Sequence, residues 1–287
     1  MQKSCLIFIF LCVTFIINSQ NHNYSLEYCW KLLSENKHTE CVIECERVLF
    51  YSGSPEDQKN ALFIKGLSLK QQLDFNKAAD TFNQIRITSS ESTFFNEKFY
   101  EQSLCNYLAG DFENALTNIN QYEYLSHGDT IPNEILLVKI LSLNSLFHFE
   151  DAKNATLALI TNNNLNSELI NSTENLFRRK NCPRKKNPEK AKNLSMIVPG
   201  LGHIYAGRWV EGGISFVLNA GALSFGLYNI YIEYYFTGYV IGFTLLNKFH
   251  SGGMKRSYIL AETKNKRNIV NFNQHFLELW RQIAHAD

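Results

Sequence analysis

Four residues near the N-terminus have the types and the spacing of a metal site. His38, Cys41 and Cys45 recur at intervals of three and four residues, so they share one face of a predicted helix, and Cys29 lies on the helix before it. Imidazole and thiolate groups in such an arrangement can bind zinc. The chain has no C-x-x-C pair, however, and Cys41 and Cys45 also fit the packing sites of a repeat, where a free thiol acts as a small hydrophobic group. We therefore expect no metal here and no cofactor.

Catalytic and nucleotide-binding patterns are missing from the sequence. It contains no G-x-S-x-G, P-loop, dinucleotide-binding or H-E-x-x-H motif. Acidic residues are scattered, so no pair of carboxylates can be assigned to acid–base catalysis. With 28 Lys and Arg against 27 Asp and Glu, the chain also lacks the basic field of a nucleic-acid-binding protein. We expect no enzyme activity, no catalytic residue and no nucleic-acid partner.

Residues 1–19 have the pattern of a secretory signal peptide. One Lys precedes an apolar run of about 13 residues, and Ser19 offers the small residue of a cleavage site. The run is shorter than the ~20 residues that a membrane span needs. The alternative interpretation is an uncleaved signal anchor.

The central region contains an internal repeat. The pattern Asp-Phe-x-x-Ala occurs in the segments beginning at Leu73 and Gly110, which are 37 residues apart. Each unit has the apolar spacing of two helices joined by a short polar turn. We therefore predict an all-α fold with repeated helical hairpins over residues 22–180. At the period of 37 lie the small positions Cys41, Ala78, Ala115 and Ala152 and the larger positions Cys45, Phe82, Ile119 and Thr156.

This region resembles the tetratricopeptide repeat through Gly66 in the first helix of a unit and Ala78 and Phe82 in the second. The resemblance covers residues 22–162, followed by a predicted capping helix over Asn166–Lys180, and the closing proline of the family is missing. It implies a solenoid whose concave groove, lined by the first helices, holds a protein partner. Carried over position by position, the groove residues are Trp30, Phe63, Leu67, Lys70, Tyr100, Leu104, Tyr107, Leu137 and Asn144.

Some of these residues also have simpler interpretations. For the leucines the alternative is packing between helices, and for Lys70, Tyr107 and Asn144 it is a solvated surface. Cys29 and Cys41 occupy positions where paired helices of the repeat come closest. They are either two buried thiols or, in an exported domain, a disulfide.

Residues 181–193 are predicted to form a basic linker between two parts of the chain. The stretch from Arg178 to Lys192 holds eight basic residues, one acidic residue and two prolines, and prolines interrupt helices. Beside an apolar segment such a run attracts anionic lipid heads, by ~1 kcal/mol per charge. The alternative is a solvated linker.

Residues 194–254 have the composition of a membrane module. The 21 residues from Gly212 to Ile232 carry no charge, and the segment that begins at Tyr234 carries only Lys248 near its end. We predict a transmembrane helical hairpin in which small residues permit close contact between the two helices. The explicit small-residue pair is Gly238 and Gly242.

The piece before this hairpin, 194–206, is too short to span a membrane and is broken at Pro199, so we expect a re-entrant or interfacial segment. Together with the hairpin it resembles a bacterial membrane module with the signature P-G-x-G-x-x-Y-x-G, in which His203 stands in place of the usual glutamine. The resemblance covers residues 192–268. Modules of this kind occur beside tetratricopeptide repeats in Gram-negative envelope proteins. The matching residues are Pro199, Gly200, Gly202, His203, Tyr205 and Gly207.

Residues 255–287 are predicted to form a separate amphipathic tail. This helix either lies on the membrane, with its Trp as an anchor, or docks on the repeats. Its apolar face consists of Ile269, Phe272, Phe276, Leu279, Trp280 and Ile283.

These features together predict a membrane-anchored scaffold that binds a protein partner in the bacterial cell envelope. We expect it in the inner membrane, in contact with lipid, including anionic lipid at the basic linker. The leader places the repeats in the periplasm, whereas the basic flanks of the hairpin favour the cytoplasm. The alternative function is an accessory subunit in membrane-protein biogenesis or transport, in which the hairpin is the working part.

Overall fold

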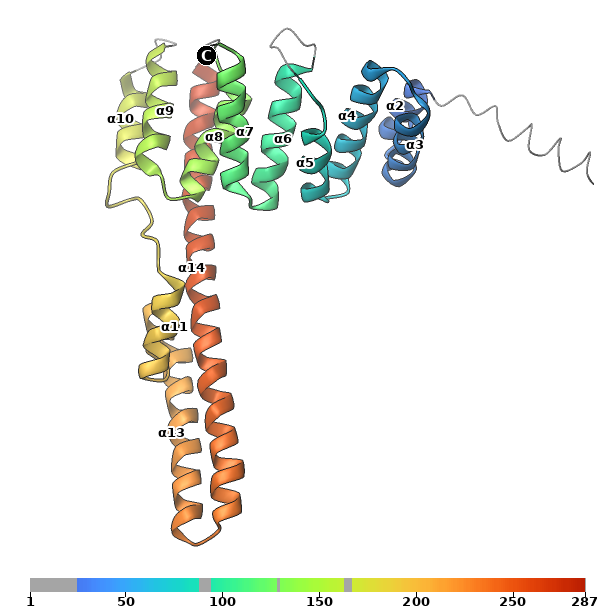
Figure 1. Cartoon of the computed structure of the whole chain (residues 1–287). Coiled ribbons are helices and arrows are strands. Elements are labelled where there is room, and N and C mark those ends of the chain that lie inside the picture. The colour runs from blue at the N-terminus through green and yellow to red at the C-terminus, as the bar shows by residue number, and fades with distance from the viewer. Residues whose placement is uncertain (1–24, 88–93, 128–129, 163–166, 287) are drawn as a thin grey trace, which may run out of the picture. The chain divides into compact units, whose positions relative to one another are not determined.

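The computed structural model describes residues 25–87, 94–127, 130–162 and 167–286. The regular elements in these ranges are all helical and none is a strand, which confirms the predicted all-α fold class (Figure 1). The predicted signal peptide lies outside the described residues. The chain divides into two compact units, Met1–Ser142 and Leu143–Asp287. This division lies within the region predicted to form repeats, before the basic linker at 181–193.

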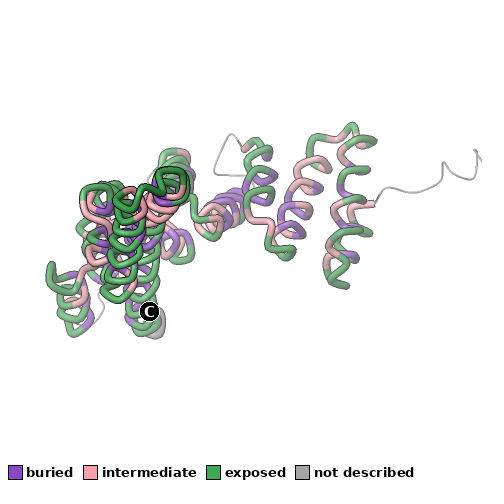
Figure 2. The backbone as a smooth tube through the Cα atoms, turned by 90° about the horizontal axis from the view of Figure 1, so that it is seen from below, coloured by how far each residue is buried: buried purple, intermediate pink, exposed green. Residues whose placement is uncertain are grey.

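The first unit is a series of helices that pack against their neighbours in the chain. Gly66 and Phe82 show how two of them approach, because a Cβ on Gly66 would lie 2.6 Å from the ring of Phe82. Ala78, Phe82, Ala115 and Ile119 are fully buried. Figure 2 shows buried positions on successive helices of this unit. The helices are α2 (Leu26–Ser34), α3 (His38–Tyr51), α4 (Pro55–Gln71), α5 (Phe75–Asn83), α6 (Phe95–Ala109), α7 (Phe112–Leu125) and α8 (Asn133–Ser145), the last of which crosses the division between the units.

The period of 37 residues recurs in the backbone. Among the helix ends with a residue of positive φ, four recur at this spacing, at Asn36, Leu73, Gly110 and Phe147. After each of them the next N–H donates to the carbonyl five residues back, at 2.9 to 3.1 Å, as in a Schellman ending. Asp74 and Asp111 then cap the following helix by accepting from the N–H three residues on. The aspartate of the Asp-Phe-x-x-Ala pattern is therefore an N-cap.

The second unit contains a helical hairpin and a set of shorter helices. Helix α13 packs against η1 and α14, and α11 and α12 pack against α14 (Figure 1). The helical path is interrupted between α11 and α12 at Pro199 and Gly200, where the sequence predicts an interruption. The elements are α9 (Phe149–Asn162), α10 (Ser167–Leu176), α11 (Pro188–Ile197), α12 (Leu201–Tyr205), α13 (Trp209–Tyr231), the π-helical turn η1 (Thr237–Gly242) and α14 (Phe243–Ala286).

Helix α14 is continuous through the position at which a separate tail was predicted to start. Gly252 and Gly253 lie inside this helix of 44 residues and do not end it. At its C-terminal end Phe272 contacts Phe149 and Phe177, with ring centroids 5.0 and 5.6 Å apart. Farther along, Leu279 and Ile283 share an apolar cluster with Ile160 and Leu169 of α9 and α10. The amphipathic face of the predicted tail therefore covers α9 and α10.

Candidate functional site

The glycines of the P-G-x-G-x-x-Y-x-G segment let three helices approach at backbone distance. A Cβ on Gly202 would lie 1.9 Å from the carbonyl oxygen of Ala191, and one on Gly200 would lie 2.1 Å from that of Gly212. The N–H of Gly202 also donates to Oγ of Ser195 at 3.1 Å. These contacts join α11, α12 and α13, so the segment acts as a packing motif.

The remaining residues of the segment shape the ends of α12. Pro199 precedes the helix and has no N–H to donate. Gly207 follows it with φ of 86°, and the next N–H, that of Arg208, donates to the carbonyl of His203 at 2.8 Å. This ending resembles those of the repeat helices and requires a residue that tolerates positive φ.

Tyr205 connects this module to the end of the basic linker. Its Oη accepts a hydrogen bond from the N–H of Asn187 at 3.2 Å, and Nζ of Lys186 lies 4.7 Å from its ring centroid. The side-chain amide of Asn265 on α14 binds both backbone groups of Lys186, at 2.8 and 2.7 Å. The C-terminal end of the linker is thus fixed to the module and not freely solvated.

Small residues let the two arms of the hairpin approach to backbone contact. A Cβ on Gly242 would lie 2.5 Å from Cα of Gly226, and one on Gly238 would lie 3.0 Å from the carbonyl oxygen of Gly226. The predicted Gly238/Gly242 pair therefore lies at the contact between η1 and α13. The turn between them contains Glu233 with φ of 65°.

An uncovered apolar surface surrounds this hairpin. Among the described residues, Trp209–Tyr231 is the one helix that is long and apolar enough to cross a membrane, and 22% of its most apolar window is buried. The exposed large apolar side chains of the hairpin include Trp209, Val210, Ile214, Phe216, Val217, Leu218, Leu223, Phe225, Leu227, Tyr228, Tyr231, Tyr234, Tyr235, Phe236, Tyr239, Val240, Ile241 and Phe243.

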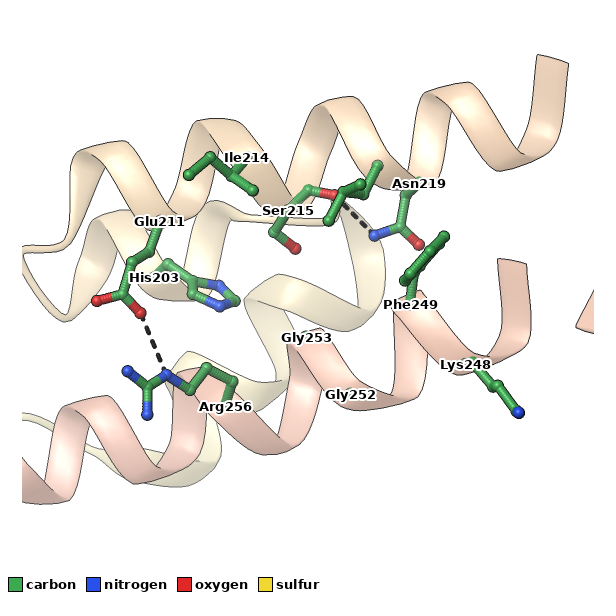
Figure 3. A pocket seen from close by; sticks show the side chains of 11 residues that line it. His203, Glu211, Ile214, Ser215, Asn219, Lys248, Phe249, Gly252, Gly253 and Arg256 are labelled. Carbon is green, nitrogen blue, oxygen red and sulfur yellow. Dashed lines mark hydrogen bonds and ion pairs between the residues drawn. The ribbon is translucent and has the colours of Figure 1, made fainter. Parts of the chain in front are cut away.

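At the other end of the hairpin, α12, α13 and α14 line an open cavity of about 310 Å³. Figure 3 shows Glu211, Arg256 and His203 towards one end of it and Asn219, Phe249 and Lys248 towards the other, with the exposed side chain of Lys248 directed outward from α14. The remaining lining residues are Ile214, Ser215, Leu218, Gly252 and Gly253.

Two polar side chains in this cavity are buried and incompletely paired. His203 is 3% exposed and Asn219 is 4% exposed, and neither Nδ1 of the histidine nor Oδ1 of the asparagine has a hydrogen-bond partner. Nδ2 of Asn219 donates to the carbonyl of Ser215 at 2.8 Å. Burial lowers the pKa of His203, an effect that Glu211 opposes and Arg256 reinforces. The sequence identified His203 through its motif, but it gave no signal for Asn219.

The residues predicted to line a groove have mixed environments. Trp30 is exposed, whereas Phe63 is buried against the rings of Phe82 and Phe94. Asn144 is fully buried, and both atoms of its amide lack a partner. The half-buried members of the set are Leu67, Lys70, Tyr100, Leu104, Tyr107 and Leu137.

Lys70 is engaged inside the first unit. Its Nζ lies 2.5 Å from Oε2 of Glu101, which joins α4 to α6. Both side chains are largely shielded from solvent, at 19% and 12% exposure. A substitution of Lys70 alone would therefore break this ion pair as well as change the predicted groove surface.

Lys98 on α6 is a buried cation for which the sequence gave no signal. It is 4% exposed, and its Nζ lies 4.0 Å from the ring centroid of Phe99. Burial lowers its pKa to about 8.

The cysteines of the suspected metal group are buried free thiols. Cys29, Cys41 and Cys45 belong to one apolar cluster, and Sγ of Cys41 donates to the carbonyl of Cys29 at 3.3 Å. A hydrogen bond with the Cys45 thiol lowers the pKa of Cys29 and that of Cys41. The same hydrogen bonds raise the pKa of Cys45. Within the described part of the chain no group of three or more His, Cys, Asp or Glu residues is arranged to hold a metal ion.

Comparison of the chain with protein-family models, with curated proteins and with solved structures found no match. The resemblances to the tetratricopeptide repeat and to the membrane module therefore stay predictions.

Proposed function

We propose that this protein is a membrane-anchored scaffold. Its hairpin of α13, η1 and the first part of α14 crosses a bilayer, and its first unit, a tetratricopeptide-like solenoid, binds a protein partner. The setting is the inner membrane of a bacterial cell, with the first unit in the periplasm. The observation that carries the proposal is the exposed apolar surface around the hairpin.

The dimensions of α13 support membrane insertion. A helix of 23 residues is about 35 Å long, which exceeds a hydrocarbon core of ~30 Å. Its outward side chains are apolar and open, and Val217 is 67% exposed. A soluble monomer rarely exposes so large an apolar surface. Tyr231, Tyr234 and Tyr235 are exposed around the hairpin turn, where aromatic residues favour the membrane interface.

The case for partner binding rests on the first unit. It offers several short helices whose aromatic and aliphatic side chains are only partly covered, including Trp30, Tyr100, Leu104 and Tyr107. Aromatic residues are enriched among the side chains that dominate binding energy at protein interfaces. Phe63 contributes to the core of this unit and is excluded from the proposed contact surface.

Membrane anchoring is tested by charging the apolar surface. Val217→Lys combined with Leu223→Lys places two charges on exposed positions of α13, and each charge costs ~3 kcal/mol at the centre of a spanning helix. The full chain should then be extracted from membranes by alkaline carbonate. Val270→Lys on α14, also at an exposed apolar position but outside the hairpin, is the matched control and should stay in the membrane. Extraction of the unmodified chain under the same conditions would refute anchoring.

Partner binding is tested by photocrosslinking in membranes, with the crosslinker at Trp30. Tyr100→Ala with Tyr107→Ala should abolish the crosslinked product. The charge swap Lys70→Glu with Glu101→Lys keeps the internal ion pair and serves as a second, milder surface change. An unchanged product in the double tyrosine variant would reject this surface. Protease accessibility of a tag in the first unit shows on which side of the membrane that unit lies.

A further inference from the structure

The cavity between α12, α13 and α14 contains polar atoms that the chain leaves unpaired. Nδ1 of His203 and Oδ1 of Asn219 are buried in its lining without a hydrogen-bond partner. Each such atom costs about 1–3 kcal/mol, so a native structure that keeps two of them in one cavity points to a group from outside the chain. Both atoms are acceptors. The asparagine oxygen always accepts, and burial keeps the imidazole of His203 neutral at pH 7, which leaves Nδ1 free to accept when Nε2 carries the proton.

The charges of the cavity favour an anion. Nε of Arg256 lies 3.1 Å from Oε2 of Glu211, whereas Lys248 has no ion pair among the described residues. Asn219 shares one end of the cavity with Lys248 and lies about 18 Å along α13 from Tyr231. In a spanning hairpin that level is inside the ~30 Å hydrocarbon core, where an unpaired ammonium group is costly. A negative group in the cavity would compensate it.

Two glycines lie beside the cavity in the middle of α14, and Gly252 leaves open space whereas Gly253 allows α14 to approach α13. A Cβ on Gly252 would meet nothing within 4 Å, and one on Gly253 would meet Oγ of Ser215 at 3.0 Å. Glycine in a helix interior is less favourable than alanine by about 1 kcal/mol, so the pair is unfavourable for the helix alone. Ile214 and Leu218 line the cavity and are also exposed on the outside of α13. The cavity thus continues into the apolar surface of the hairpin.

We propose that this cavity holds the head of an anionic phospholipid whose headgroup carries hydroxyl groups, as phosphatidylglycerol does. The inference rests on the membrane anchoring proposed above. The phosphodiester lies at the Lys248 end of the cavity, the hydroxyl groups donate to Asn219 and, farther along the cavity, to His203, and the acyl chains follow the apolar surface of α13. A phosphocholine head offers no such donors. Glycerophosphoglycerol offers the same polar groups without acyl chains.

Native mass spectrometry of the full chain in a mild non-ionic detergent tests the proposal. Phosphatidylglycerol and phosphatidylcholine with matched acyl chains are added at equal concentration, and the bound fraction of each is measured as the collision energy rises. We expect at least tenfold more phosphatidylglycerol to remain bound, since its hydroxyl groups can donate to His203 and Asn219, whereas a choline head has no donor and brings a positive charge towards Lys248. Equal retention of the two lipids would overturn the proposal.

Paired variants locate the site. Gly252→Leu fills the hollow and favours the helix, and Lys248→Gln removes the unpaired charge; each should reduce retained phosphatidylglycerol about tenfold. Gly221→Leu, where a side chain also meets open space, and Lys255→Gln, an exposed lysine outside the cavity, are the matched controls and should retain it. Retention in both cavity variants at the unmodified level would place the lipid elsewhere.

Two further measurements separate the possible failures. Flotation of the full chain with phosphatidylcholine vesicles tests membrane anchoring alone. If the chain floats but shows no preference for phosphatidylglycerol, the cavity proposal is rejected and anchoring stands. If the chain does not float, both proposals are rejected. Calorimetric titration of glycerophosphoglycerol into the full chain in phosphatidylcholine nanodiscs tests the source of the head. Binding of this soluble compound as tightly as the intact lipid would overturn the assignment to a lipid.

Discussion

The buried ammonium group of Lys98 should lower the stability of the first unit by an amount that depends on pH. Its pKa is lowered from 10.5 to about 8 by burial, and this difference corresponds to about 3 kcal/mol. Below pH 8 the amine is charged in both the folded and the unfolded chain, so the full penalty is present. Between pH 8 and 10.5 the folded chain loses the proton first, and the free energy of unfolding should rise with pH.

Replacement of Lys98 by methionine removes the charge and keeps much of the side-chain volume. At pH 7 we expect Lys98→Met to raise the free energy of unfolding by about 3 kcal/mol, and the difference from the unmodified chain should shrink towards pH 10.5. Lys98→Arg keeps the charge at every pH used and should not show the rise. The ring of Phe99, 4.0 Å from Nζ, offsets only part of the penalty.

Urea unfolding of the full chain in non-ionic detergent can measure this effect. The chain has three tryptophans, of which Trp30 lies in the first unit, so Trp209→Phe and Trp280→Phe leave a reporter for that unit alone. Midpoints are compared at several pH values between 7 and 10.5. Equal stability of the lysine and methionine proteins at pH 7, with parallel pH profiles, would show that the ammonium group reaches water and would refute the argument.

Three other predictions concern the backbone, the helix contacts and the thiols. Leu73→Gly should stabilise the first unit by about 1 kcal/mol, read by urea unfolding, because Leu73 has φ of 63° and its side chain is 73% exposed. Gly202→Ala should destabilise the second unit by about 3 kcal/mol, read by thermal unfolding in detergent, whereas Gly213→Ala, which meets nothing within 4 Å, should not. In the folded chain a maleimide should label Cys182, which is partly exposed, much faster than the buried Cys45, and urea should remove the difference.

Each of these has a clear contrary result. A loss of stability in Leu73→Gly would show that the leucine side chain makes a contact worth more than the backbone strain. Equal melting of the Gly202 and Gly213 variants would mean that α11 and α12 separate readily. Equal labelling of the two cysteines in folded protein would mean that the N-terminal thiol cluster opens to solvent.

Local patterns in the sequence predicted much of the fold. The uncharged stretch from Gly212 to Ile232 predicted α13 to within three residues at each end, because a long apolar run leaves few alternatives. The Asp-Phe-x-x-Ala pattern has a spacing of 37 residues, and residues with positive φ recur at the same spacing at Asn36, Leu73, Gly110 and Phe147. Of these four residues only one is glycine, so the left-handed helix ends could not be identified from composition.

Tertiary contacts decided the features that the sequence did not reveal. The sequence predicted a separate tail from residue 255, yet α14 continues because it packs on α11, where Oγ of Ser257 donates to the carbonyl of Ala191 at 3.2 Å. The resemblance to the tetratricopeptide repeat placed Phe63 in the groove, but the neighbouring rings of Phe82 and Phe94 cover it. The cavity depends on residues from three helices, and no local pattern connects Asn219 to Lys248.

The continuity of α14 also sets an order for the synthesis of the chain. The rings of Phe149 and Phe177 are covered by Phe272 and Phe276, which leave the ribosome last. Until Phe272 and Phe276 are synthesised, the apolar side of α9 and α10 stays uncovered. The hairpin is synthesised after α10 and before these two residues. The hairpin is therefore synthesised before that cluster can close, and a chain stalled after the hairpin would carry an incomplete core with exposed aromatic rings.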